Sequence, residues 1–349
     1  MVEAWFIILC LMLTVFVVLE GWDFGAGALH LIVARTRAER RQLIAAIGPL
    51  WSWHEVWLIG SGGVLFAAFP TVLASSFAGF YLALNMILWS LLLRGISIEV
   101  GGHLDDALWQ SFWDFVFALS NLLLAVLFGA ALGNVLRGVP LDENGKFSLP
   151  LFTHFDTHGH VGILDWYTIS VAGFTVLILL AHGAAYLEVK TEGAVHARSA
   201  QWARRLWPIV MLLFPVITAE TWYVRPDFAA GFAHRPLSWL SVAAALGGII
   251  AVFAGQRKNK ESLAFAGSCT FIIGLMAGAA ASVFPTMLHS TLAPEHSITA
   301  YNGCASIQSL TVALWWWPFA FVLACIYFVF ILRNYRGKAK ETKDTQGFY

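Results

Sequence analysis

Long apolar runs separated by short polar segments set the pattern of this chain. The hydrocarbon layer of a bilayer is about 30 Å thick, so a helix that crosses it needs about 20 mainly apolar residues. No stretch shows the alternation that is typical of a strand. The pattern therefore predicts an all-α integral membrane protein with nine membrane-spanning helices, near residues 4–28, 53–75, 77–97, 112–136, 163–188, 207–224, 238–255, 262–284 and 307–332.

Two longer connections divide the predicted helices into groups. Residues 137–162 and 285–306 are polar, contain prolines and are expected to be outer loops. The polar break Glu20–Gly27 is echoed by His182–Glu188, although two matches do not establish a duplication. We expect a first four-helix bundle over 1–136, a second over 163–284, and a ninth, peripheral helix with a cytoplasmic tail over 307–349.

Lysine and arginine fall mostly on one side of the predicted helices. With the N-terminus outside, the inner segments, including the tail with Lys340 and Lys343, hold all of the 21 basic residues except Arg137, Lys146, Arg225 and Arg235. The positive-inside rule therefore predicts an outer N-terminus and an inner C-terminus. The basic residues are scattered and form no aromatic-interleaved patch, which argues against nucleic acid as a partner.

Composition agrees with this class of protein. The chain is 59% hydrophobic and 12% charged, and it contains 16 Trp and 27 Phe. These values are typical of polytopic membrane proteins and not of soluble domains. The four cysteines occur singly and without a CxxC pair, so neither a disulfide framework nor an iron–sulfur site is expected.

Two carboxylates interrupt the first apolar run. Glu20 and Asp23 lie inside a stretch that is otherwise able to cross a bilayer. An acidic side chain at the centre of such a helix costs roughly 2.5–3.5 kcal/mol on translocon scales. At positions i and i+3, the two side chains share one helical face. Because this cost needs a functional reason, we interpret both residues as candidates for handling protons or ions.

A second polar group opens the second predicted span. Trp53 and Trp57 stand one helical turn apart, and His54 and Glu55 lie between them. Two interpretations stay open. In the first, the tryptophans anchor the helix at the membrane surface and the titratable pair sits in headgroup water. In the second, that pair continues the polar path of the first span, and the two indoles, with Trp22, line a quinone site or a subunit interface.

Other polar residues are expected to be structural. Arg94, Glu99, Asp114 and Asn121 are expected to be buried, and Arg94 to pair with one of these acids. Asn302 belongs to the weakly polar end of the second outer loop, a segment able to cap a bundle.

No metal or haem site is predicted in this chain. His182 is the histidine placed clearly within a span, and a lone histidine there is more often hydrogen-bonded to a neighbouring helix than bound to haem iron. His154, His158 and His160, with Asp156 among them, have spacings that a metal ion accepts, but no fourth strong ligand adjoins them.

Several motifs, in order along the chain, carry a family resemblance. They are Glu20-Gly-Trp-Asp-Phe-Gly-Ala-Gly27, Glu55-Val-Trp-Leu-Ile-Gly-Ser-Gly-Gly-Val-Leu-Phe-Ala-Ala-Phe-Pro70, Gly133-Asn-Val-Leu-Arg-Gly-Val-Pro140, His182-Gly-Ala-Ala-Tyr-Leu-Glu-Val-Lys-Thr-Glu-Gly193 and Phe284-Pro285 with Ser297-Ile-Thr-Ala-Tyr-Asn302. Together they resemble subunit II of the cytochrome bd family of quinol oxidases. The second motif is specific, whereas the acidic motif by itself is weak.

The resemblance implies a subunit without haem of its own in a bacterial or archaeal plasma membrane. In that family, subunit I carries the haems b and d and the quinol site, and small accessory subunits join some complexes. Quinol is oxidised near the outer face, and dioxygen is reduced to water with protons from the cytoplasm. Subunit II stabilises subunit I, is suggested to contribute a polar route, and in some members holds a structural quinone. Asp23 matches the second acid of the family's Asp-Gly-Phe-Asp motif, and Glu20 replaces the first.

Ser52 departs from the family pattern, because many members have an aspartate after the tryptophan that matches Trp51. This departure leaves open a route through His54 or Glu55 and a variant complex that does not reduce oxygen. Two further alternatives remain at this point. In the first, the chain would be an assembly scaffold whose acids form interhelical hydrogen bonds. In the second, it would be a secondary transporter whose carboxylates bind a coupling ion.

Overall fold

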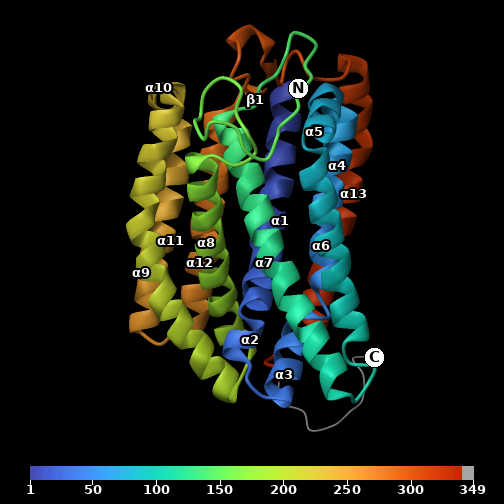
Figure 1. The fold of residues 1–349 in the computed structure, drawn as a ribbon, viewed down its shortest axis with the longest axis vertical. Helices are drawn as coiled ribbons and strands as arrows, with labels where there is room; N and C mark the ends of the chain where they lie inside the picture. The colour runs from blue at the N-terminus through green and yellow to red at the C-terminus, as the bar shows by residue number, and fades with distance from the viewer. Residues whose placement is uncertain (340–349) are drawn as a thin grey trace.

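The computed structural model describes residues 1–339, and this part of the chain is mostly helical (Figure 1). Two short strands, β1 (Thr286–Leu288) and β2 (Ile298–Thr299), pair antiparallel. The tail beyond residue 339, with Lys340 and Lys343, lies outside the described residues. The α-helices are α1 (Val2–Ala28), α2 (His30–Val33), α3 (Arg37–Ile47), α4 (Trp51–Ala68), α5 (Pro70–Gly79), α6 (Tyr81–Val100), α7 (Ala107–Arg137), α8 (Trp166–Lys190), α9 (Gly193–Val224), α10 (Pro226–His234), α11 (Trp239–Arg257), α12 (Glu261–Val283) and α13 (Ile307–Asn334), with 3₁₀ turns η1 (Pro236–Ser238) and η2 (Pro294–His296).

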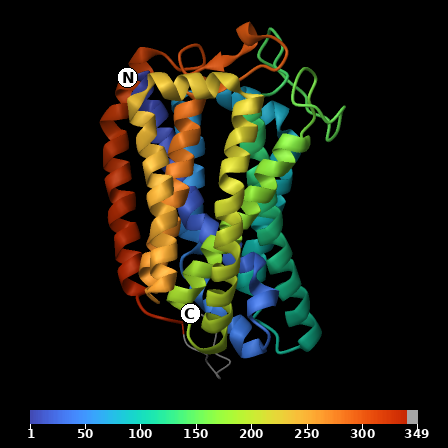
Figure 2. The ribbon, with the colours of Figure 1, turned by 90° about the vertical axis from the view of Figure 1, so that its left-hand side faces the viewer.

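The described residues contain eight helices that are long and apolar enough to cross a membrane, or nine crossings if a bent pair forms one more. The eight are α1, α6, α7, α8, α9, α11, α12 and α13. The bent pair is α4 and α5. The start of α1 and the end of α13 lie at opposite ends of the molecule, as an odd number of crossings requires (Figure 2). The prediction of an all-α membrane protein is confirmed.

The second predicted span is not one straight helix. α4 ends at Ala68, and α5 leaves it at an angle of 120°. Pro70 is the first residue of α5 and has no N–H to donate, and the residue before a proline is disfavoured in helical conformation. Phe69 accordingly has φ −132° and ψ 58°. The expected continuous span over 53–75 is therefore wrong, and the next span begins only at Tyr81.

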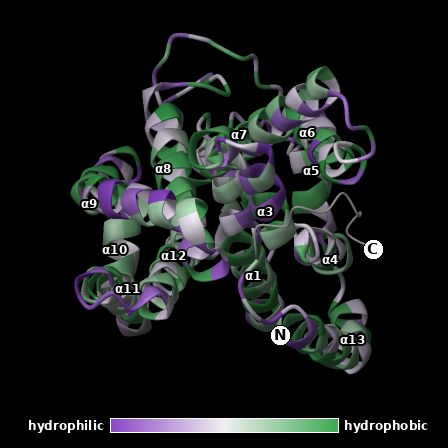
Figure 3. Cartoon of the chain, turned by 90° about the horizontal axis from the view of Figure 1, so that it is seen from below, coloured by the Kyte–Doolittle hydropathy of each residue, from purple (hydrophilic) through white to green (hydrophobic). Residues whose placement is uncertain are grey.

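α1 lies at the centre of the helices. It contacts α4 and α7 on one side and α8 and α12 on the other (Figure 3). α6 packs on α7, whereas α9 packs on α8 and α11 packs on α12. α13 lies at the periphery against α4 (Figure 3). α1 thus belongs to the first group of helices and also joins it to the second.

Glycines allow α1 and α8 to approach closely. A Cβ atom on Gly25 would overlap the backbone of Leu179, and one on Gly183 would overlap the backbone of Gly25 and Ala26. Small residues at such crossings let helix backbones pack against each other in membranes. The two groups of helices are therefore held together at a point one turn from Asp23.

Substituting Gly25 by alanine is expected to destabilise this contact. The new methyl group overlaps backbone atoms, and overpacking of this kind costs about 1–3 kcal/mol. Gly173→Ala, also in a helix but with no atom within 4 Å of the added Cβ, is the matched control. Thermal unfolding of the purified protein should show a lower midpoint for Gly25→Ala and an unchanged midpoint for Gly173→Ala. Equal midpoints for the two variants would contradict the close packing.

The loops that follow α7 and α12 lie together at the end of the molecule where α1 begins (Figure 1). The backbone of Val139 donates to the carbonyl of His289, and the hydroxyl of Ser290 donates to the carbonyl of Leu141. Thr291 donates its hydroxyl to the carbonyl of Gly159. The two expected outer loops therefore form one cap.

Acidification is expected to loosen this cap. Burial, assisted by Arg225 and opposed by Asp227, lowers the pKa of His289 from 6.5 to about 4. Between pH 6.5 and pH 4, His289 therefore binds a proton in the unfolded chain but not in the folded cap. The free energy of unfolding falls as the pH falls through this range. Thermal midpoints measured between pH 7 and pH 4 should decline less in His289→Asn than in the wild type. Equal declines in the two proteins would show that His289 is not the cause of the loss of stability.

Candidate functional site

Charged and titratable side chains meet in the protein interior between α1, α4 and α6. Arg94 donates from Nη1 to Glu20 Oε2 at 2.6 Å and from Nη2 to Asp23 Oδ2 at 3.1 Å. His54 Nδ1 lies 2.7 Å from the same Asp23 oxygen. All four side chains are 0% exposed. We call Glu20, Asp23, His54 and Arg94 the carboxylate cluster.

Local structure explains how the carboxylate cluster forms. The i and i+3 positions of Glu20 and Asp23 place both acids on the face of α1 that meets α6. The guanidinium of Arg94 also lies over aromatic rings, 5.1 Å from the centroid of Phe24 and 5.8 Å from that of Trp51. Paired charges and ring contacts together offset part of the large cost of burying ions in a helix bundle.

The carboxylate cluster has more acidic than basic groups and contains free acceptor atoms. Two carboxylates face the one guanidinium of Arg94, so its positive charge balances only one of them. Glu20 Oε1, Asp23 Oδ1 and His54 Nε2 are buried and have no hydrogen-bond partner among the described residues. Each of these atoms is able to accept a proton or a hydrogen bond from water. The carboxylate cluster therefore combines buried acids with free acceptor atoms.

A metal ion does not fit the same residues. One ligand atom each from Glu20, Asp23 and His54 lies within 4.8 Å of the others, a spacing that a metal ion accepts. However, the guanidinium of Arg94 already contacts both carboxylates, and a second cation beside it would be repelled.

Glu55 connects the carboxylate cluster to the surface. Glu55 Oε1 lies 3.7 Å from Arg94 Nη1, and its side chain is 22% exposed. Ser52, one turn earlier on α4, is exposed. Of the open interpretations of this helix, the arrangement favours the polar path, because His54 is buried against Asp23 and does not sit in headgroup water.

The tryptophans separate into two environments. Trp22 stacks on Tyr186 with centroids 5.0 Å apart and meets the edge of His54, so it packs beside the carboxylate cluster. Trp53 and Trp57 instead line a cavity of about 420 Å³ between α1, α4 and α13. Its other walls are mainly apolar and aromatic, with Trp317, Phe321 and Phe328 among them.

The remaining predicted polar residues lie elsewhere. Asp114 binds His30 Nε2 at 2.9 Å and Arg40 Nη1 at 2.8 Å. The expectation that Arg94 pairs with Asp114 or Glu99 is corrected, because Arg94 pairs with acids of α1 and α4. The helix register decides this, because Arg94 faces α1 at the level of Asp23. The expected burial of Glu99 is wrong, because this residue is exposed near the end of α6, where the helix reaches the surface. Asn302 accepts from the backbone of Thr299 at 2.7 Å and shapes the turn after β2.

His182 makes two hydrogen bonds within the helices. Its Nδ1 lies 2.7 Å from Ser268 Oγ and its Nε2 lies 3.0 Å from the carbonyl of Val18. The expected hydrogen-bonded role is confirmed. His158 and Asp156 are 3.7 Å apart on an exposed part of the loop.

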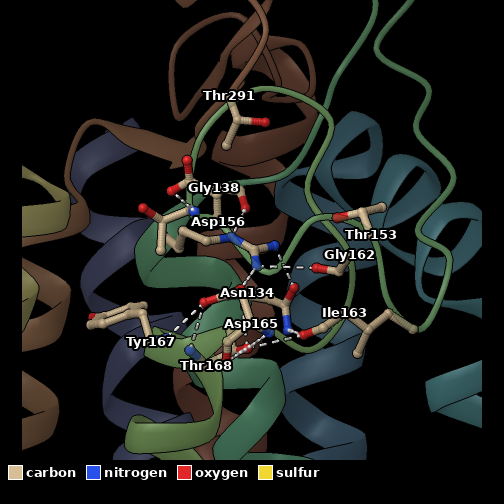
Figure 4. A network of polar contacts seen from close by, with 12 residues as sticks. Asn134, Gly138, Thr153, Asp156, Gly162, Ile163, Asp165, Tyr167, Thr168 and Thr291 are labelled. Atoms are coloured by element: carbon tan, nitrogen blue, oxygen red, sulfur yellow. Dashed lines mark hydrogen bonds and ion pairs between the residues drawn. The ribbon is translucent and has the colours of Figure 1, made fainter.

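A second buried network was not predicted. Arg137, at the end of α7, pairs with Asp165, at the start of α8, and both side chains are fully buried. Arg137 also donates to the carbonyls of Gly138 and Gly162, and Asn134 donates to the carbonyl of Ile163 (Figure 4). These bonds close the base of the first outer loop. The sequence signal was the placement of Asn134 and Arg137 at one end of the loop and Asp165 at the other.

These features define an all-α, multi-pass membrane protein with a buried cluster of charged and titratable side chains next to an aromatic cavity. The chain belongs to the cytochrome bd terminal oxidase subunit II family, whose sequence model matches residues 1–334. The predicted family membership is thereby confirmed.

Relatives and a solved structure agree. The chain is 29% identical to a probable cytochrome oxidase subunit 2 of Haemophilus influenzae, over 95% of this chain and 92% of the relative. It is also 29% identical to the cytochrome bd ubiquinol oxidase subunit 2 of Bacillus subtilis, over 89% and 88%. The bd oxidase of Geobacillus thermodenitrificans has the same fold, with a TM-score of 0.72, 16% identity, and coverage of 96% of this chain and 99% of that one.

Proposed function

We propose that this chain is subunit II of a membrane complex that oxidises quinol and reduces dioxygen to water. The match of the family to residues 1–334 carries this proposal. Its partner, subunit I, would hold the haems b and d and the quinol site, and small accessory subunits would join them. We place the complex in a bacterial or archaeal plasma membrane with the N-terminus of this chain outside. The helix contacts support a first bundle over 1–136 and a second over 163–284.

Within that complex, we assign a proton route to Glu20, Asp23, His54 and Glu55. The buried, unpaired oxygens of the two acids support this assignment, and so does the partial exposure of Glu55 beside Arg94. Ser52 lacks the carboxyl group that many members have at this position, and Glu55, one turn further along α4, supplies one. Protons would enter or leave the carboxylate cluster through Glu55.

The cavity beside Trp53 and Trp57 is our proposed site for a structural quinone. Its volume of about 420 Å³ and its aromatic walls suit a flat ring with an apolar tail. The close ring contact between Trp53 and Tyr327, 4.1 Å between centroids, joins α4 to α13 at one end of this site.

Purification of the complex through a tag on this chain tests the proposal. A reduced-minus-oxidised spectrum with haem b and d signals, together with quinol-driven oxygen consumption, is the expected result. Organic extraction of the same sample should release quinone in a fixed ratio to haem d. A stable but haem-free preparation would overturn the oxidase assignment, and substrate uptake by this chain alone would favour a transporter.

A further inference from the structure

A basic groove lies at the end of the molecule opposite the outer cap. One wall is the face of α3 that carries Arg37, Arg40 and Arg41, at positions i, i+3 and i+4. The opposite wall is the turn after α6 and the start of α7, with Gly102, Trp113 and Asp114. The groove encloses about 60 Å³. In the view from this end, α3 lies between α7 and α1 (Figure 3).

The charges of the groove are not balanced. Arg40 pairs with Asp114 at 2.8 Å, and Arg41 pairs with Asp105 at 3.3 Å. His30 approaches Asp114 from the protein interior and shares that carboxylate with Arg40. Arg37 is exposed and has no ion pair with any described residue. Three guanidinium groups therefore face two carboxylates, and the groove keeps a positive charge.

Two residues that line the groove also carry a buried donor that is unsatisfied. Arg40 Nε and Trp113 Nε1 have no hydrogen-bond partner among the described residues. A buried N–H without an acceptor costs about 1–3 kcal/mol, so such donors normally meet an acceptor. Guanidinium and indole N–H donors, together with an excess of positive charge, suit an anion with several oxygen atoms, such as a phosphate group.

The position of the groove indicates what carries that phosphate. The groove lies where two membrane-spanning helices, α6 and α7, end. Trp109 and Trp113 meet edge to face there, 5.7 Å between centroids, and tryptophans of this kind sit at the level of lipid headgroups. Leu108 and Phe112, beside them on α7, are exposed and apolar. Acyl chains would find apolar surface next to the charged groove.

We propose that this groove binds the phosphate of an anionic phospholipid, with Arg37, Arg40 and Trp113 as donors. Each basic side chain near a charged membrane surface contributes a several-fold increase in affinity for anionic lipid. Occupancy of the groove would clamp α3 against the ends of α6 and α7. The site is separate from the proton route, and the proposal does not depend on the oxidase activity.

Native mass spectrometry of the purified complex tests this site. Wild-type complex, delipidated and then given phosphatidylglycerol in phosphatidylcholine nanodiscs, should retain one anionic lipid that Arg37→Gln/Arg40→Gln loses, with affinity about tenfold lower. Arg204→Gln/Arg205→Gln removes the same charge from α9 and should retain the lipid. Trp113→Phe keeps an aromatic side chain and all the charges but removes the indole N–H donor. It should therefore weaken lipid retention, and it tests the site even if the double variant does not assemble.

Three results would overturn the proposal. One is equal retention of phosphatidylglycerol by wild-type complex and by Trp113→Phe. Another is displacement of the lipid by millimolar inorganic phosphate, since a groove that prefers the free anion is a site for soluble phosphate and not for lipid. Retention of phosphatidylcholine in place of phosphatidylglycerol would contradict the charge argument in the same way.

Discussion

Replacing Arg94 by glutamine is expected to lower the yield of intact complex at least tenfold. Arg94 is fully buried and contacts Glu20 at 2.6 Å and Asp23 at 3.1 Å. Its removal leaves two buried carboxylates without a counter-ion, and breaking a buried ion pair from one side costs about 3–5 kcal/mol. The measurement is the amount of complex recovered per milligram of membrane protein, with its thermal midpoint.

Two further variants serve as controls for Arg94→Gln. Arg204→Gln also removes an arginine, but Arg204 is exposed and bonds Asn259 at the surface, so the yield should not change. Adding Glu20→Gln to Arg94→Gln removes one of the two stranded charges and should recover part of the yield. If Arg94→Gln assembles as well as the wild type, the ion pairs of the carboxylate cluster do not stabilise this subunit.

Replacing Asp23 by asparagine is expected to lower turnover about tenfold or more while the complex still assembles. The amide keeps the size of the side chain and one oxygen that accepts from His54 and Arg94, so packing should survive. An amide, unlike a carboxyl group, neither takes up nor releases a proton in a relay. Loss of a group that transfers protons costs typically 10²–10⁴-fold at the reacting centre, and a relay away from that centre costs less.

Asp23→Glu and Asp156→Asn complete the series. Glutamate restores a carboxyl group and should return part of the turnover, whereas Asp156 is 59% exposed in the outer loop and its change should have no effect. The assembly-scaffold alternative predicts the opposite order for Asp23→Asn, with lost yield and an unchanged rate per complex. Oxygen consumption per haem d and haem content per milligram, measured on one preparation, separate the two.

The sequence predicts the acids of this site better than their partners. Glu20 and Asp23 stand out because a charge inside an apolar run is costly wherever the helix packs. The partner of Arg94 depends on the rotation of α6 about its axis, which hydropathy does not determine. Arg137 was counted with the outer basic residues, although it is buried against Asp165, because loop closure is a tertiary property.

Some of the local structure had readable signals. Pro70 is the physical cause of the bend between α4 and α5, and a proline at that place permits either a kink or a break. Thr36 and Glu39 form a capping box at the start of α3, and the Thr-x-x-Glu spacing that makes it is visible in the sequence. The length of an apolar run gives the existence of a span, but its straightness depends on such residues.

The most direct test of the central claim is proton uptake during a single turnover in proteoliposomes. Fully reduced complex is mixed with oxygen, and a pH indicator on the cytoplasmic face is followed together with the haem d absorbance. The proposed route predicts that Asp23→Asn slows the cytoplasmic proton uptake and the coupled haem oxidation to the same extent. Wild-type proton uptake in an assembled Asp23→Asn complex would contradict a proton route through this subunit.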